Sequence, residues 1–165
     1  MDTTKAAIWG TIGGLANVGA LAFAPAFYPS WYFMLVAVGY GLLLPVLAVL
    51  QVRHRAVRES GAALGTAAGM ATVTVGIAAS ANSDLVVAAL LVRGIWWWTL
   101  GKMWNDTGVV ARWLGIPTMA LALLALGAAV ASAPMGVATA TIWMSERLLL
   151  GLWTLALSYA LWTSR

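Results

Sequence analysis

The chain has no cysteine and little charge. Without cysteine it can form no disulfide, no zinc–thiolate site and no iron–sulfur cluster. Only 8% of its 165 residues are charged, against roughly a quarter in an average soluble domain, whereas 62% are hydrophobic. A soluble protein of this size needs more polar surface than this chain can supply. The composition therefore predicts an integral membrane protein.

The residues needed for several kinds of chemistry are also scarce. The single histidine, His54, lies between two arginines, so a bis-histidine haem and a histidine-rich metal site are excluded. No Ser-His-Asp set can be assembled, and no glycine-rich phosphate loop followed by Lys-Ser or Lys-Thr is present. We therefore expect neither a cofactor nor a metal, and no enzymatic activity. The net charge of +4 does not indicate nucleic acid, because the basic residues are spread between apolar runs.

Apolar runs near the ~20 residues that cross a bilayer fill most of the sequence. Prolines or polar residues separate the runs, and no break has room for a soluble domain. The expected fold class is an all-α membrane protein with six transmembrane helices, in a single transmembrane domain over residues 1–165. Pro45 and Pro117 are expected to kink two of these helices. The runs cover residues 6–27, 31–52, 61–81, 85–104, 109–131 and 137–162.

Lysine and arginine between the runs or near their ends all fall on one side of the membrane if this division is correct. Cytoplasmic loops of membrane proteins carry the excess of Lys and Arg, so both termini are expected in the cytoplasm. A missed or extra helix would scatter these charges over both sides. The residues concerned are Lys5, Arg53, Arg55, Arg58, Lys102, Arg112 and Arg165.

Two short patterns suggest that the chain repeats a helical hairpin three times. The pattern Gly-Thr-x-x-Gly-x-Ala-x-Val begins at Gly10 and again at Gly65, and Trp-Thr-Leu begins at Trp98 and again at Trp153. Both pairs are separated by the same offset, a third of the chain. Apolar sequence of low diversity also produces such matches by chance.

Glycines at every fourth position mark faces on which helices pack closely. Gly10 and Gly14 form one such stripe, and Gly61, Gly65 and Gly69 form another. In lipid, helices associate by close approach of their backbones, which small residues permit. The two stripes can pack helices within one subunit or join subunits in a homo-oligomer or membrane complex.

Charged residues inside the predicted spans are the strongest functional signal. Arg93 lies about 12 Å into its helix at 1.5 Å per residue, and Glu146 and Arg147 lie about as deep in the last helix. A lone charge at this depth costs about 2.5–3.5 kcal/mol, so the charges should find partners. We predict an Arg93–Glu146 ion pair. Arg147 points about 100° away from Glu146 and needs another acceptor or a path to the interface.

Tryptophans surround these charges and predict an aromatic pocket. Trp96 and Trp97 follow Arg93 by one helical turn, and Trp143 and Trp153 flank Glu146. A cavity with one carboxylate and indole faces suits a lipophilic cation or a flat amphipathic ligand. Alternatively, the indoles only pack and the ion pair is structural. The remaining tryptophans near predicted interfaces are typical of aromatic belts: Trp9, Trp31, Trp104, Trp113 and Trp162.

The segment Asp106-Thr107-Gly108-Val109-Val110-Ala111-Arg112-Trp113-Leu114-Gly115 resembles a cytoplasmic turn of uncharacterised small six-helix bacterial membrane proteins. Those proteins commonly have a glycine and a short apolar pair before Pro-Arg-Trp-Leu-Gly. This chain has Ala111 where the proline is usual. The resemblance implies a bacterial cytoplasmic (inner) membrane and implies no activity.

Two functions remain open at this point. The first is a non-enzymatic membrane protein that binds or transports a small lipophilic or cationic molecule near Arg93, Glu146 and Arg147. The second is a structural or accessory subunit of a larger membrane complex, which the short loops and glycine stripes favour. A lipid enzyme is the weakest alternative, since no nucleophile or metal set is recognisable.

Overall fold

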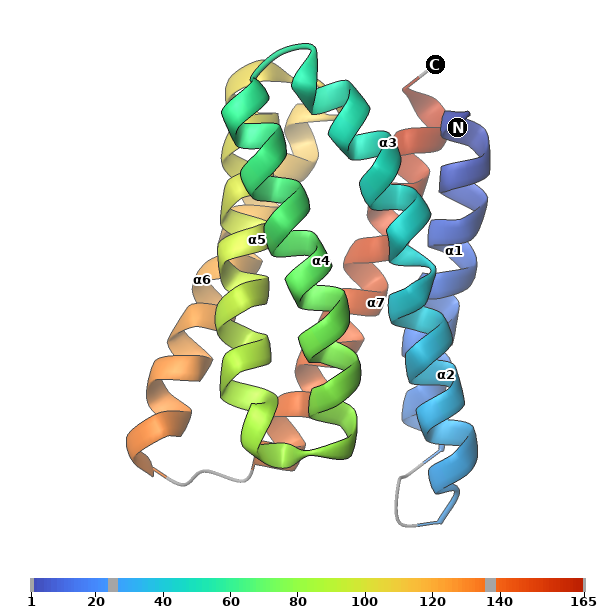
Figure 1. Ribbon diagram of the computed structural model, residues 1–165, viewed down its shortest axis with the longest axis vertical. Helices are drawn as coiled ribbons and strands as arrows, with labels where there is room; N and C mark the ends of the chain where they lie inside the picture. Colours follow the sequence, from blue (N-terminus) through green and yellow to red (C-terminus); the bar gives the residue numbers. More distant parts are fainter. Residues whose placement is uncertain (1, 24–26, 136–138, 165) are drawn as a thin grey trace.

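The computed structural model describes residues 2–23, 27–135 and 139–164, and their side chains outside 133–140. The described residues form helices joined by short turns, with no strand among them. α2 and α3 are one rod interrupted at Leu42, so the described residues form six rods (Figure 1). The elements are α1 (Thr3–Gly19), η1 (Ala20–Ala22), α2 (Pro29–Gly41), α3 (Leu43–Arg55), α4 (Glu59–Ala81), η2 (Ser83–Leu85), α5 (Val86–Thr107), α6 (Arg112–Met135) and α7 (Thr139–Thr163).

Proline and glycine set several of the helix boundaries. Pro29 opens α2 at its first turn, where the missing N–H has no helical partner in any case. The interruption at Leu42 follows from Pro45, which has no N–H to donate to the carbonyl of Gly41. Gly108 ends α5 in the left-handed region at φ 66°. α6 runs through Pro117 without a break, so only one of the two expected kinks interrupts its helix.

The first predicted helix is too long at its C-terminal end. α1 passes into η1 and stops at Ala22, because Phe23 has extended backbone angles of φ −112° and ψ 90°. The predicted end at residue 27 is therefore wrong. The other described boundaries lie within a few residues of the predicted ones. α5 and α6, in the second half of the chain, end a few residues later than predicted.

Long apolar helices dominate the architecture. By length and composition, the described part of the chain contains four helices that can cross a membrane. α1 is shorter, and α7 carries two charged residues within its length. The four qualifying segments are Pro29–Arg55, Glu59–Ala81, Ser83–Thr107 and Arg112–Ser132.

The six rods stand side by side in a ring, with α7 behind α4 and the α2–α3 rod in Figure 1. Each rod packs on its neighbours in the order α1, α2–α3, α4, α5, α6 and α7. α1 packs extensively on α7, and α6 on α5, whereas the contact between α6 and α7 is slight. The seam between α6 and α7 is therefore the loosest in the ring.

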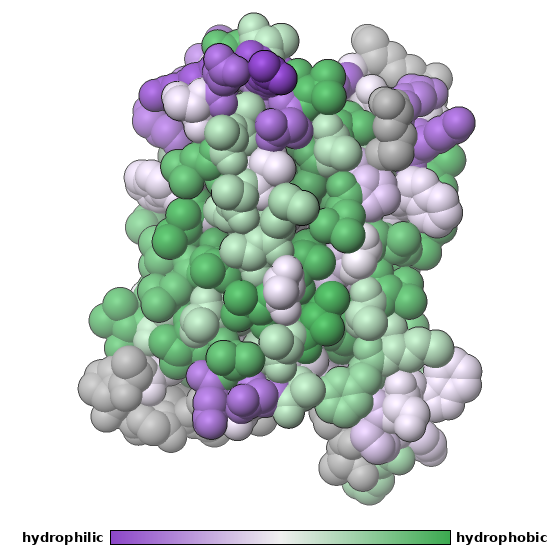
Figure 2. Space-filling model, in the orientation of Figure 1, coloured by the Kyte–Doolittle hydropathy of each residue, from purple (hydrophilic) through white to green (hydrophobic). Residues whose placement is uncertain are grey.

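Polar residues collect at the ends of the bundle. The described ends of the chain lie together at the upper end in Figure 1, beside the turns that join α3 to α4 and α5 to α6. Figure 2 shows hydrophilic residues there, a broad hydrophobic band below them and a smaller hydrophilic group at the opposite end. Arg53 ties the upper end together by donating to Ser164 Oγ at 2.8 Å and to Thr3 Oγ1 at 3.5 Å.

Four of the five predicted packing glycines lie inside the bundle. Gly10 and Gly14 face α7, where an added Cβ at Gly14 would lie 2.9 Å from Leu155. Gly65 faces Leu100 of α5, and Gly69 leaves only 2.9 Å between an added Cβ and Trp96 Nε1. These glycines therefore join helices within the subunit.

Gly61 is the exception, because it lies partly exposed between α4 and α5. An added Cβ there would meet Arg58 Cδ at 3.4 Å, in ordinary contact.

The three hairpins of the predicted repeat do not have equal packing. α4 packs on α5, but α6 and α7 barely touch. Trp98 and Trp153, which the repeat relates, also differ in environment: Trp98 is 44% exposed and Trp153 only 3%. The repeat stays a prediction from the sequence.

Candidate functional site

The predicted ion pair between Arg93 and Glu146 is present at the centre of the bundle. Arg93 Nη1 on α5 contacts the Glu146 carboxylate on α7, and both residues are buried. The matched depth of the two residues in their helices brings them to the same level. Each charge therefore offsets part of the cost of burying the other.

Tyr40 of α2 is a third member of this cluster that the sequence did not reveal. Arg93 Nη2 donates a hydrogen bond to the Tyr40 hydroxyl group. Room for the ring comes from Gly76 of α4, where an added Cβ would overlap the Tyr40 ring. A tyrosine in an apolar run gives no sign of this role until the fold places it beside an arginine.

Arg147 is buried without a carboxylate beside it. Its Nη2 donates to Ser80 Oγ at 2.8 Å, while Nε and Nη1 have no hydrogen-bond partner among the described residues. The guanidinium carbon lies 5.0 Å from the centre of the Tyr32 ring and 5.1 Å from that of Trp143. Because Ser80 is at the end of α4 and Tyr32 at the start of α2, the side chain reaches toward the end of the bundle, as the prediction required.

The four predicted tryptophans divide into two groups. Trp96 and Trp97 pack against Trp153 in the core, with ring centres 5.1 and 5.7 Å apart. Trp153 donates to Thr118 Oγ1 at 2.9 Å. Trp143 lies close to both guanidinium groups, 5.2 Å from that of Arg93 and 5.1 Å from that of Arg147. The Trp97 ring also lies 5.8 Å from the Arg93 guanidinium group, whereas Trp96 and Trp153 mainly fill the core. The four indoles therefore do not form one open pocket around the charges.

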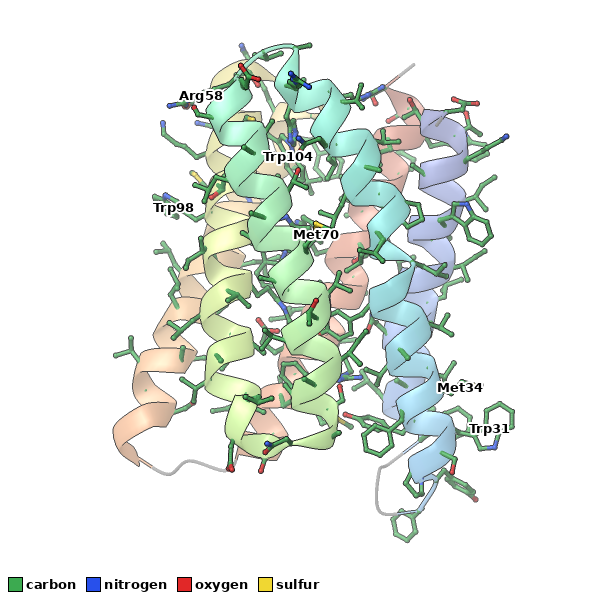
Figure 3. All side chains as sticks on the ribbon, viewed as in Figure 1. Trp31, Met34, Arg58, Met70, Trp98 and Trp104 are labelled. Atoms are coloured by element: carbon green, nitrogen blue, oxygen red, sulfur yellow. The ribbon has the colours of Figure 1, made fainter. Side chains whose placement is uncertain are left out.

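Trp104 and His54 are placed differently from the prediction. Trp104 is fully buried and is not part of an interfacial belt. Its Nε1 donates to Nε2 of His54 at 2.8 Å, and His54 is itself buried at the end of α3. Figure 3 shows Trp104 within the bundle, whereas Trp31 and Trp98 point away from it. The sequence places His54 between two arginines in the break after residue 52, but the structure places it within α3.

Comparisons with protein-family models, with curated proteins and with solved structures found no match for this chain. The site is therefore interpreted from its own geometry.

A pocket of about 270 Å³ lies between α6 and α7, with Glu146 in its lining. Its walls are almost wholly apolar, with Leu121, Leu124 and Ala128 from α6 and Ile142 from α7. Glu146 forms part of the wall of the pocket, and its Oε1 is buried and has no hydrogen-bond partner among the described residues. The pocket occupies the loosest seam of the ring.

The charge of the cluster limits what it can bind. Two guanidinium groups and one carboxylate lie together, and aromatic faces near them already hold Arg93 and Arg147 in cation–π contacts. The part of the chain that the structure describes contains no group of three or more metal-binding side chains. The arrangement can receive an apolar molecule through α6 and α7 and present a buried acceptor to it.

Proposed function

We propose that this chain is an inner-membrane protein of bacteria with six transmembrane helices and both termini in the cytoplasm. The number of rods supports this topology, since an even number returns the chain to its starting side. The basic residues near the helix ends support the orientation, because those helix ends meet at one end of the bundle.

Within that bundle we propose binding or transport of a small lipophilic molecule, without a chemical step. The observation that carries this proposal is the apolar pocket between α6 and α7 that ends on the buried, ion-paired Glu146. A ligand from the lipid phase would enter between the two helices that pack least. A hydroxyl or amide group on it would donate to Glu146 Oε1, which has no partner in the described part of the chain.

A cationic ligand is the less favoured of the two ligand types expected from the sequence. A third positive charge near the cluster would face both Arg93 and Arg147, and like charges repel strongly where the dielectric constant is low. The aromatic faces suited to a cation are also taken by these arginines. A neutral or acidic lipophilic molecule fits the site better.

The role of accessory subunit ranks second. The glycine stripes that favoured it contact helices of the same chain, so they do not offer a flat face to a partner. A subunit role would leave the Glu146 pocket without a ligand of its own.

The proposal is tested by native mass spectrometry of the protein extracted gently from its own membrane. Ala128 lines the pocket, so Ala128→Phe fills it. Ala120 lies exposed on the same helix and away from the pocket, so Ala120→Phe is the matched control. We expect a defined small molecule with the wild type and with Ala120→Phe, and its loss with Ala128→Phe.

Glu146→Gln separates the two functions. Loss of the co-purified molecule with a folded protein supports the binding site. Stoichiometric partner proteins without any small molecule, in the wild type as in the variants, would instead make the chain an accessory subunit and overturn the proposal.

A further inference from the structure

A second hollow surface runs between α4 and α5 and reaches α6. It consists of two adjoining pockets of about 240 and 410 Å³. They share Leu64, Trp98 and Thr99, so they form one continuous surface, here called the α4–α5 groove. In Figure 3, Arg58 and Trp98 lie on the same flank of the bundle, with Arg58 nearer the end that holds the termini.

The groove has positive charge at this end only. Arg58 and Lys102 both line the upper pocket. Arg58 forms no ion pair among the described residues, and Lys102 bonds Asp106 at 2.8 Å while its side chain stays 54% exposed. The upper pocket therefore has a surplus of one positive charge and two groups that can donate to a phosphate.

The lower pocket is apolar and faces the hydrophobic band. Leu64 is 53% exposed, Ile95 47% and Trp98 44%, although all three are large hydrophobic side chains. Leu123 and Leu126 of α6 continue the surface away from the charged end. The groove therefore changes from cationic to apolar over about two helical turns, which is the order of polarity along a phospholipid.

We propose that the α4–α5 groove is a binding site for an anionic phospholipid. The phosphate lies between Arg58 and Lys102, and one acyl chain follows Leu64 and Trp98 into the apolar band. Basic pockets between transmembrane helices on the cytoplasmic side bind such headgroups. This inference rests on the proposed membrane topology and is independent of the pocket between α6 and α7.

Free phosphate could satisfy the cationic end but would leave the apolar part unused. The lipid is favoured because the groove is continuous and its apolar part is the larger.

The test titrates delipidated protein with phosphatidylglycerol or phosphatidylcholine and counts bound lipids by native mass spectrometry. We expect the wild type to prefer phosphatidylglycerol, and Arg58→Gln to lower that affinity about fivefold. Arg55→Gln is the matched control, because Arg55 lies at the end of α3 just before the same turn, pairs with Glu59 and does not line the groove. Equal binding of the two lipids, or equal losses in both variants, would overturn the proposal.

The variant Asp106→Asn should change the affinity for phosphatidylglycerol in the opposite direction. Removing this carboxylate frees Lys102, so phosphatidylglycerol should bind more tightly, which a general loss of stability would not produce. A separate experiment adds inorganic phosphate in place of lipid. If phosphate alone raises the melting temperature of the protein and Arg58→Gln abolishes this effect, the groove is a phosphate site and the lipid proposal is wrong.

The two proposals can fail separately. Ala128→Phe should leave the binding of phosphatidylglycerol unchanged, and Arg58→Gln should leave any molecule in the pocket between α6 and α7 in place.

Discussion

A carboxylate at the centre of an apolar bundle keeps its charge only if a cation lies against it. Glu146 meets this condition through Arg93, and Arg93 is held from a second side by the Tyr40 hydroxyl group. Buried ion pairs of this kind seldom add much stability compared with apolar residues of similar size, but losing one partner is expensive. The pair is therefore best probed by removing its members singly and together.

Glu146→Leu should lower the free energy of unfolding by about 3–5 kcal/mol, because it leaves Arg93 buried without a counter-charge. The double variant Arg93→Met with Glu146→Leu should recover most of that loss. Unfolding by dodecyl sulfate in micelles, followed by circular dichroism, measures both. Glu59→Gln, in the exposed pair with Arg55, serves as the control and should have little effect. Additive losses in the double variant would contradict an energetic coupling of the pair.

Arg147 should behave in the opposite way. Its guanidinium group is fully buried, and two of its nitrogen atoms lack partners in the described part of the chain. Arg147→Met keeps the length of the side chain and removes the charge, so it should leave the stability unchanged or raise it by about 1–4 kcal/mol. The same unfolding measurement decides this. A large loss of stability would mean that the contacts with Ser80, Tyr32 and Trp143 outweigh the cost of burying the charge.

At the scale of the helices, close packing depends on a few positions without a side chain. Gly76 of α4 gives space to the Tyr40 ring and so sets the place of the hydroxyl group that Arg93 uses. Gly127 of α6, in contrast, has no atom within 4 Å of an added Cβ. Alanine at these two positions therefore compares a crowded site with an open site in the same protein.

Gly76→Ala should destabilise the protein by about 1–3 kcal/mol, because the methyl group would overlap a ring that cannot move freely. Gly127→Ala should be neutral or stabilising by up to about 1 kcal/mol, since alanine is the better helix former. Thermal unfolding of both variants in the same detergent gives the comparison. Equal changes in stability in the two variants would show that the Tyr40 ring can move aside without a loss of stability.

The local sequence is enough to predict the helices and the central ion pair, but it does not predict which side chains from other helices surround them. Runs of apolar residues fix the rods, and the depth of Arg93 and Glu146 within their runs fixes their common level. The sequence missed Tyr40 and the buried bond from Trp104 to His54, because both depend on which helices become neighbours. It also extended the first helix beyond Ala22, since Phe23 is as apolar as the residues before it and leaves the helix only in its backbone angles.

At the scale of the whole molecule, the two ends of the bundle differ in charge. Basic residues in and beside the turns between α3 and α4 and between α5 and α6 lie at the end of the bundle with the described chain ends, while the turn between α4 and α5 carries Asp84. This asymmetry is what orients a protein in the membrane during insertion.

The proposed orientation predicts which positions are reached from outside the cell. The chain has no cysteine, so a single cysteine at an exposed turn is a specific label site. A membrane-impermeant maleimide should label Ser83→Cys in intact spheroplasts, and should label Ala56→Cys only after lysis, because the two turns lie at opposite ends. The reverse pattern would invert the topology, and labelling of both from outside would rule out six spans.

The order of residues along the chain makes the ion pair a late event in biosynthesis. A ribosome delivers α5 with Arg93 well before α7 with Glu146, although Tyr40 has already been made and can accept a hydrogen bond. During that interval the arginine waits in the bilayer or its translocation channel without its counter-ion. The last helix to emerge is thus the one that supplies the counter-charge of Arg93, and a chain that stops before α7 should be unstable because this arginine has no carboxylate to pair with.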